Sequence, residues 1–209
     1  SPLATISRVS NASGNATVTA AQVDNGSSDA CGIASLSLSQ TSFTCANVGA
    51  NTLTLTVTDA SGNSSSCSAT VTVNDNNPPV ALCQPVTIYL DASGNATIVA
   101  SDIDGGSTDN GTIASLIASQ TAFDCSDLGA NNVTLTVTDD GGNTDDCIAI
   151  VTVLDTIAPT VICQNITVSL DGSGNAVITG ADLDGGSSDN CGTLTFSSST
   201  TTFSSVGTY

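Results

Sequence analysis

The chain has 209 residues and a formal net charge of −18, with nineteen acidic residues, all of them Asp, and a single cationic residue, Arg8. This charge excludes nucleic acids and anionic membranes as partners, because both are bound through Lys and Arg. Lys, Glu and His are absent, so only Asp pairs remain for acid–base chemistry, and we do not expect an enzyme.

The chain begins with SPLATISRVS, which has no signal-peptide pattern, and it holds no apolar run long enough to cross a bilayer. Its eight cysteines lie in strand-like contexts, without the His or CxxC pair that would suggest zinc. We therefore expect disulfides and an oxidising compartment. The sequence is typical of a mature or excised piece of a secreted protein that is extracellular or held at the cell surface.

An 80-residue period dominates the sequence. NASGNAT (11–17) recurs as DASGNAT (91–97) and as DGSGNAV (171–177). Such a period is the signature of a repeat architecture, and the third copy stops before the motifs that end the other two. Either the molecule continues or another chain supplies the missing strands. We expect three domains, with the boundaries 1–75, 76–155 and 156–209.

Short β-strands follow one another along each copy, as the second copy illustrates. The turn DASGN (91–95) separates the first two strands, and an irregular crossover through Phe123 and Leu128 precedes the closing hairpin. Short strands with turn signals about every ten residues predict an all-β, Ig-like sandwich, and three in tandem predict an elongated rod. The strands are expected at 80–90, 96–100, 113–119, 132–139 and 147–153.

Acidic loops are predicted to converge at one end of each copy. If the first strand runs down and the second runs up, the loop SDIDGGSTDN (101–110) lies at the end where the chain enters. The loop DDGGNTDD (139–146) precedes the last, downward strand and lies there too. The linker NDNNPP (74–79) arrives at the same end. Three segments rich in Asp and Asn should therefore meet between successive copies.

A calcium site is the expected consequence. Several carboxylates cannot share a small volume without a cation, and Ca²⁺ takes six to eight oxygen ligands from Asp, Asn and carbonyl groups. The competing interpretation is that these residues only form turns, which we favour for Asp91 and Asp171. The expected metal ligands are Asp75, Asn77, Asp102, Asp104, Asp109, Asp139, Asp155, Asp182, Asp184 and Asp189, with Asp24, Asp29 and Asp59 in the first copy.

Two disulfides are expected. Parallel first and last strands place Cys83 and Cys147 near one edge. A competing pair, Cys67 with Cys83, would have to close a span of about 16 residues at about 3.3 Å each, while disulfide Cα atoms lie about 5–6 Å apart; it needs a chain that doubles back. Cys31 and Cys45 form the second expected pair. The partners of the remaining cysteines stay open: Cys67, Cys125, Cys163 and Cys191.

The linker VTVNDNNPPV (71–80) resembles the calcium-binding linker between cadherin repeats. The 80-residue unit is similar to hyalin-repeat and related Ig-like families, through SDNCG (188–192) and TDASGN (58–63). Arrays of this kind occur in large bacterial surface adhesins and extracellular filaments. The resemblance covers nearly the whole chain and implies a structural or adhesive role outside the cell, with calcium stiffening the array.

The expected function is that of a calcium-stabilised stalk or filament repeat of a secreted adhesin or extracellular fibre. Its partners would be neighbouring repeats or identical chains, in a head-to-tail filament. The alternative is an adhesive module whose repeats contact glycans or a partner cell directly. Sugar-binding sites usually expose aromatic rings, and this chain has only two Tyr and four Phe, which favours the stalk.

Overall fold

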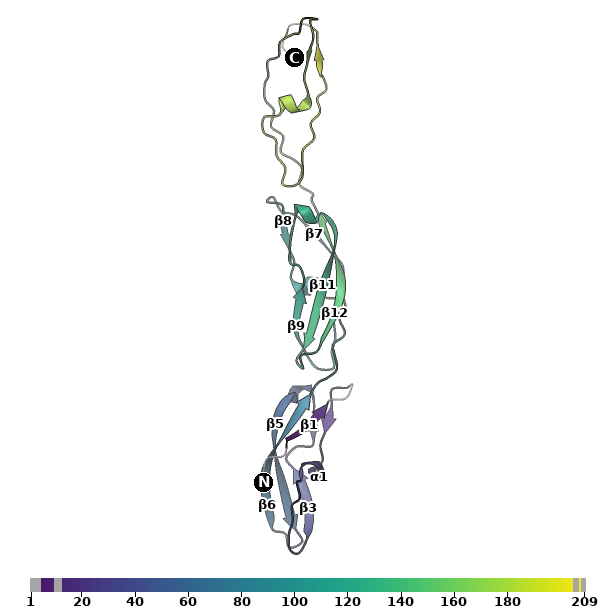
Figure 1. The fold of residues 1–209 in the computed structure, drawn as a ribbon, viewed down its shortest axis with the longest axis vertical. Coiled ribbons are helices and arrows are strands. Elements are labelled where there is room, and N and C mark those ends of the chain that lie inside the picture. Colours follow the sequence, from purple (N-terminus) through teal and green to yellow (C-terminus); the bar gives the residue numbers. More distant parts are fainter. Residues whose placement is uncertain (1–4, 10–12, 205–206, 208–209) are drawn as a thin grey trace. The chain divides into compact units, whose positions relative to one another are not determined.

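The computed structural model describes residues 5–9, 13–204 and 207, and its regular structure is almost entirely strand (Figure 1). The 80-residue period reappears in the order of these elements. We use first, second and third copy for residues 1–75, 76–155 and 156–209.

The first copy is a sandwich of two sheets. The four-stranded sheet has the order β1-β6-β5-β3, in which β1 lies parallel to β6 and the other neighbours are antiparallel. The two-stranded sheet pairs β2 with β4. Its elements are β1 (Thr5–Val9), β2 (Ala16–Thr17), α1 (Ala20–Val23), β3 (Ile33–Leu38), β4 (Ser42–Phe43), η1 (Cys45–Asn47), β5 (Gly49–Asp59) and β6 (Ser64–Asn74).

Alternation of small apolar and polar residues builds the core between these sheets. On β5, Leu53 and Leu55 are buried while Thr54 between them is exposed. On β6, Val71 and Val73 are buried, and Phe43 of β4 completes the same apolar cluster. A core made from one Phe and a few aliphatic side chains is small, so covalent or ionic reinforcement is needed.

The second copy repeats this architecture 80 residues later. Its four-stranded sheet has the order β7-β12-β11-β9, and β8 pairs with β10. Its elements are β7 (Val86–Tyr89), β8 (Asn95–Thr97), η2 (Ala100–Asp102), β9 (Ile113–Ala118), β10 (Ala122–Asp124), η3 (Cys125–Asp127), β11 (Gly129–Asp139) and β12 (Thr144–Leu154).

The five predicted strands of this copy appear in the predicted order, but two are shorter than expected, and a sixth strand, β10, lies where an irregular crossover was predicted. The predicted strand 80–90 is reduced to β7, because Val80 and Cys83 form only isolated bridges, to Thr108 and Asp104. The predicted strand 96–100 ends at Thr97 and is followed by the 3-10 turn η2. The all-β sandwich itself is as predicted.

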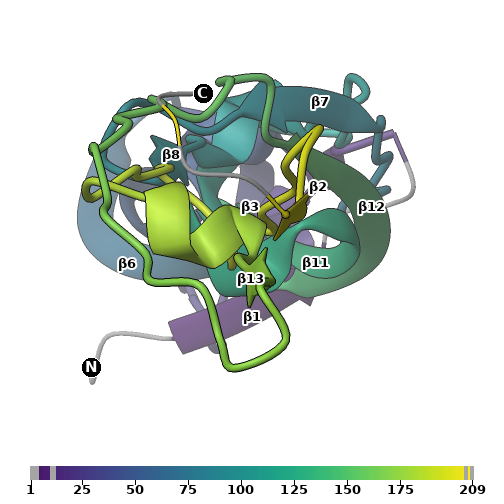
Figure 2. The ribbon, with the colours of Figure 1, turned by 90° about the horizontal axis from the view of Figure 1, so that it is seen from above.

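The third copy forms only part of the sandwich. Among its described residues the regular elements are β13 (Ala176–Val177), η4 (Gly180–Leu183) and β14 (Thr202–Phe203), with β13 and β14 paired. Figure 2 shows η4 and β13 together, surrounded by irregular chain.

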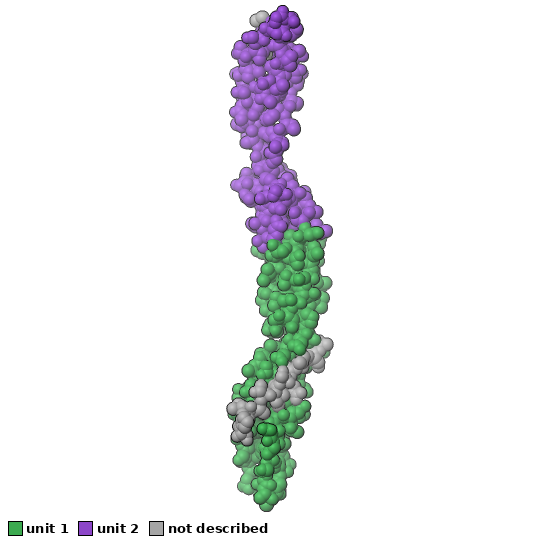
Figure 3. Space-filling model, viewed as in Figure 1, with its two compact units in different colours: residues 1–85, 99–119, 132–149 green, residues 86–98, 120–131, 150–209 purple. Residues whose placement is uncertain are grey.

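The chain divides into two compact units: residues 1–85, 99–119 and 132–149, and residues 86–98, 120–131 and 150–209 (Figure 3). This division runs through the second copy and does not follow the 80-residue period. The boundaries 1–75, 76–155 and 156–209, and the rod, therefore stay predictions.

Candidate metal centre

Three aspartates from distant parts of the sequence come together in the first compact unit. One carboxylate oxygen each of Asp75, Asp109 and Asp139 lies within 4.8 Å of the others. Asp75 is 4% exposed and Asp139 is 1% exposed, while Asp109 is half-buried. Among the described residues these are the three carboxylates that cluster closely enough to hold a metal ion.

Strand ends position these side chains. Asp75 directly follows β6, Asp139 is the last residue of β11, and Asp109 lies in the loop before β9. The three segments meet as expected from the strand directions, and they bring Asp75, Asp109 and Asp139 together.

Asn143 lies in the turn between β11 and β12, and its hydrogen bonds join this hairpin to the linker 74–79. Its backbone N–H donates to Asp139 Oδ1 at 2.7 Å, and its Nδ2 donates to Asp139 Oδ2 at 2.9 Å. The same Nδ2 donates to the carbonyl oxygens of Asp75 at 3.0 Å and Asn77 at 3.3 Å. Asn77 in turn donates to Asp75 Oδ1 through its backbone N–H, at 3.1 Å. The carboxylates are thus held by neutral donors.

The loop residues next to Asp109 complete the surroundings. Gly111 N–H donates to Asp109 Oδ2 at 2.6 Å. In the amide orientation that matches donors with acceptors, Asn110 Nδ2 donates to both oxygens of Asp109, and its oxygen accepts from Asn77 Nδ2 at 3.1 Å. Asn77 and Asn110 therefore link the linker to the loop.

The electrostatics of this cluster call for a cation. Like charges a few ångströms apart repel strongly once they are removed from water, and two of the three carboxylates are buried. The sequence has one Lys or Arg in total, so amine or guanidinium partners cannot generally neutralise its aspartates. The donor set is all oxygen, with neither His nor thiolate among the clustered ligands, and this set fits Ca²⁺.

Several other predicted ligands instead fold their own loops. Asp104 accepts from Ser107 Oγ at 2.6 Å and from Ser107 N–H at 2.9 Å, and the Ser107 hydroxyl holds the pKa of Asp104 below its ordinary value. Asp184 makes the same turn with Ser187, whose hydroxyl likewise lowers the pKa of Asp184. The structure does not bring these two side chains into the cluster.

The remaining loop aspartates follow the same pattern. Asp102 Oδ2 accepts from Val99 N–H at 2.8 Å, which closes η2. Asp182 closes η4 in the same way, and the Thr179 backbone N–H lowers the pKa of Asp182. Asp24 Oδ1 accepts from both the backbone N–H and the hydroxyl of Ser27, and the hydroxyl lowers the pKa of Asp24. These three residues have turn-forming roles, the interpretation that competed with metal binding.

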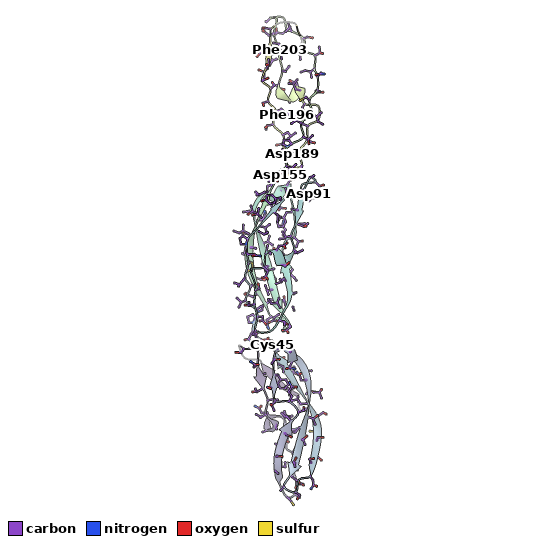
Figure 4. The ribbon with its side chains drawn as sticks, turned by 180° about the vertical axis from the view of Figure 1, so that it is seen from behind. Cys45, Asp91, Asp155, Asp189, Phe196 and Phe203 are labelled. Carbon is purple, nitrogen blue, oxygen red and sulfur yellow. A yellow bond between two sulfur atoms is a disulfide. The ribbon has the colours of Figure 1, made fainter. Side chains whose placement is uncertain are left out.

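The second unit holds a partial copy of the centre. Asp155 and Asp189 occupy the positions of Asp75 and Asp109, and Figure 4 shows them in the same region as Asp91. Asn190 Nδ2 donates to Asp155 Oδ1 and to the carbonyl oxygen of Asp91, each at 3.1 Å. Asp189 Oδ1 and Asn190 Oδ1 are buried and accept no hydrogen bond from the described residues. Such orphaned acceptors fit a cation site.

The first copy carries another partial set. Asp29 Oδ2 accepts from Cys31 N–H at 2.7 Å, as Asp109 accepts from Gly111. Asp59 Oδ1 accepts from Asn63 N–H at 2.8 Å, and the Asn63 side chain lowers the pKa of Asp59. Asp29, Asp59 and Asn63 line a shallow pocket of about 170 Å³. Two of the three cluster positions are therefore present here.

The expected disulfide between Cys83 and Cys147 is confirmed, with 5.7 Å between the Cα atoms. The expected pair of Cys31 with Cys45 is wrong, because both are free thiols. Burial, with the charge of Asp75 as a second cause, raises the pKa of the Cys45 thiol.

A second disulfide, unforeseen from the sequence, joins Cys125 to Cys191 with 5.4 Å between the Cα atoms. It links the second copy to the third rather than closing a loop within one copy. The period carries the signal that could have revealed it, since Cys45 and Gly111 stand 80 residues before Cys125 and Cys191. Cys45 accordingly lies against Gly111, where its partner would stand.

Two glycine turns let successive copies approach closely. Gly94 has φ +74°, and a Cβ there would lie 2.7 Å from Cys125 Sγ and 2.9 Å from the Asn190 carbonyl oxygen. Gly14 makes the same approach to Cys45 and Asn110. The left-handed conformation and the lack of space both require glycine.

Replacing Gly111 by Cys is expected to create a disulfide with Cys45. A Cβ at Gly111 would lie 2.9 Å from Cys45 Cβ, and a small shift brings this to the distance of about 3.8 Å found in disulfides. Mass spectrometry of the non-reduced, digested protein should show the peptide that contains position 45 linked to the peptide that contains position 111. The same substitution in a Cys45→Ser background is the control, and a free thiol at position 111 in the first variant would contradict the placement of the two loops.

No helix within the described part of the chain is long and apolar enough to cross a membrane.

No protein-family model matches the chain, and no curated protein matches it. Among solved structures, it is similar to the fibronectin(III)-like modules of Clostridium thermocellum CbhA, at 13% identity and a TM-score of 0.28, covering 74% of this chain and 92% of that one. It is similar to the protocadherin GammaB4 extracellular domain, at 17% identity and a TM-score of 0.35, over 78% of this chain and 33% of that one.

Human mucin-like protocadherin EC1-2 is a further neighbour, at 10% identity and a TM-score of 0.33, with 74% of this chain and 97% of that chain covered. Likenesses at these identities and TM-scores carry no argument about function. The all-β sandwich therefore rests on the sheets described above.

Proposed function

We propose that the chain is a calcium-stabilised structural repeat, a stalk or filament segment of a secreted cell-surface adhesin or extracellular fibre. The observation that carries this proposal is the cluster of Asp75, Asp109 and Asp139, in which Asp75 and Asp139 are buried and Asp109 is half-buried. A cation there would offset the repulsion and bind the linker, the loop and the hairpin to one another. The two disulfides support an oxidising, extracellular location.

A second cation would lie at the partial centre with Asp155 and Asp189, where the two orphaned buried oxygens support it. The domain boundaries 1–75, 76–155 and 156–209 belong to the same proposal. The junction after residue 75 and the junction after residue 155 each have aspartates gathered beside them, the complete cluster at the first and the partial centre at the second. Neighbouring repeats or identical chains are the proposed partners.

Calcium is expected to raise the melting temperature of the chain by several degrees relative to EDTA, because it binds the folded cluster and not the unfolded chain. Extracellular calcium modules have dissociation constants of about 10⁻⁴–10⁻³ M, so millimolar calcium is the appropriate titrant. Circular dichroism melts and calorimetric titration measure the two effects.

Asp109→Asn and Asp104→Asn form the matched pair for this experiment. Asp109→Asn removes a ligand but also relieves repulsion, so this variant should melt no lower than the natural chain in EDTA and lower than it in calcium. Asp104→Asn changes a turn residue outside the cluster and should keep the calcium response. Equal melts of the natural chain in calcium and in EDTA would overturn the proposal.

A further inference from the structure

β9 is an edge strand with one open side. It pairs with β11 in the sheet β7-β12-β11-β9, and no strand of the described chain pairs with its other side (Figure 1). The Ser119 N–H donates to the carbonyl oxygen of Thr134 on β11, at 2.9 Å. Backbone groups alternate between the two sides of a strand, so Ile117 also faces β11, whereas Leu116 and Ala118 present their N–H and C=O groups at the open side.

This edge lacks the features that usually prevent a strand from pairing with another chain, which are charged side chains, proline and bulges. β9 (Ile113–Ala118) contains neither an acidic residue nor proline, although the chain has nineteen Asp. A bulge lies only at its start, where the partners of Thr138 and Asp139 are Ser115 and Ile113. Residues 115–118 are therefore regular, uncharged and open.

The outward side chain of this segment is apolar and exposed. Ile117 lies on the outer face of the sheet and is 60% exposed. The positions 80 residues before and after it hold Ser37 and Ser197. β3, which is the edge strand of the first copy's sheet, thus has a hydroxyl where β9 has an isoleucine. The fold does not require an apolar residue here, which leaves Ile117 available for a contact outside the fold.

Charge and symmetry favour a second copy of this chain as the partner. Two chains with a formal charge of −18 repel each other, so a close contact between them is least opposed at a surface without aspartate, such as the edge of β9. An antiparallel pair of β9 strands with its two-fold axis at Ile117 also sets Leu116 of each copy opposite Ala118 of the other. Because these two residues carry the open backbone groups, each such pair exchanges two hydrogen bonds.

We infer that two copies of this chain associate side by side through β9, and that this joins their four-stranded sheets across a two-fold axis at Ile117. The interface is isologous, since the same residues contribute from both copies. The two Ile117 residues form a non-hydrogen-bonded pair, in which Cα atoms lie about 4.5 Å apart and the side chains are in contact. This association goes beyond the proposed stalk, because it depends neither on the aspartate cluster nor on a head-to-tail contact.

The antiparallel orientation also separates the acidic loops. The loop 101–110 precedes β9 in each copy and carries Asp102, Asp104 and Asp109. With the axis at Ile117, the two Ile113 residues lie about 26 Å apart, at about 3.3 Å a residue. The acidic loops lie beyond them, at distances well above the Debye length of about 8 Å in physiological salt. A parallel pair would place these loops side by side, and their repulsion opposes it.

Sedimentation equilibrium of the full chain tests the inference. Its exposed free thiols are first alkylated, so that only non-covalent association is measured. A single strand pair is smaller than the interfaces of about 1,200–2,000 Å² that are typical of stable complexes, so the expected dimer is weak and forms at up to about 1 mM protein. A chain that stays monomeric at this concentration would overturn the inference.

Ile117→Asp and Ser37→Asp are the matched variants. Each adds one negative charge at an exposed, outward position of an edge strand, so the general repulsion between chains grows equally. Ile117→Asp should raise the dissociation constant of the dimer at least about tenfold, because it sets two carboxylates opposite each other. Ser37→Asp should change this constant by less than about twofold, because an exposed charge outside the contact is screened. Equal weakening by the two substitutions would overturn the inference.

Cross-linking tests the register of the pair. Ile117→Cys places two thiols on the two-fold axis, within the Cα distance of about 4.4–6.8 Å that disulfides need. Ser115→Cys places thiols on the same face of the same strand, but about 13 Å apart in this register. After mild oxidation of each variant, peptide mapping by mass spectrometry should find position 117 linked to position 117, and no link between two copies of position 115. Equal yields of the two links, or a link at position 115 alone, would overturn the inferred pairing.

Discussion

Replacing Cys147 by Ser lowers the free energy of unfolding by about 4 kcal/mol, according to the loop-entropy estimate for a disulfide that closes 64 residues. Without the bond to Cys83, the unfolded chain regains the freedom of that loop. The small core of the second copy has little stability to spare, since whole domains are stable by only about 5–15 kcal/mol. Urea unfolding followed by circular dichroism measures the loss.

Cys67→Ser is the matched control, because Cys67 occupies the same place on β6 that Cys147 occupies on β12. Cys67 is an exposed free thiol, so its replacement should leave the free energy of unfolding unchanged within about 0.5 kcal/mol. Equal effects of the two substitutions would contradict a structural role for the Cys83–Cys147 bond.

Phe123→Ala is expected to cost about 3–5 kcal/mol, the range for deleting a buried aromatic ring. Phe123 is 2% exposed and is the large aromatic side chain of the second copy's core. Its removal leaves a cavity that small neighbours such as Val and Ala cannot fill. The expected signature is a lower urea midpoint with an unchanged slope.

Phe196→Ala provides the contrast, because Phe196 is 42% exposed. Its removal from the chain should change the free energy of unfolding by no more than about 0.5 kcal/mol. Equal losses of stability for Phe123→Ala and Phe196→Ala would contradict the difference in burial between the two rings.

The sequence predicted the strands well because β5 and β11 alternate Leu or Val with Thr, a period that only a half-buried strand satisfies. It also predicted the Cys83–Cys147 bond, because parallel first and last strands bring their ends to one edge. It could not separate Asp109 from Asp104 as cluster members. That difference depends on Ser107, whose hydroxyl turns the Asp104 carboxylate into its own loop.

The Cys31–Cys45 error has a related cause. Sequence proximity within one copy suggested that pair, whereas the observed bond, Cys125–Cys191, joins neighbouring copies. Predicting it requires knowing that the turn at Gly94 and the loop at Asn190 approach each other, a tertiary contact that no local pattern contains. The 80-residue shift could have suggested it, but only by comparing cysteines across two copies.

The two disulfides have a mechanical consequence, because the loops they close overlap between Cys125 and Cys147. If the chain is pulled from both ends and unfolds, tension passes through one sulfur bridge, back along that overlap and out through the other. Most residues from 83 to 191 then carry no load and add no length, although each loaded residue could extend by about 3.3–3.6 Å. A reducing agent would cleave the two disulfides and let these residues extend as well. The redox state therefore determines how far the chain can be stretched before a backbone bond breaks.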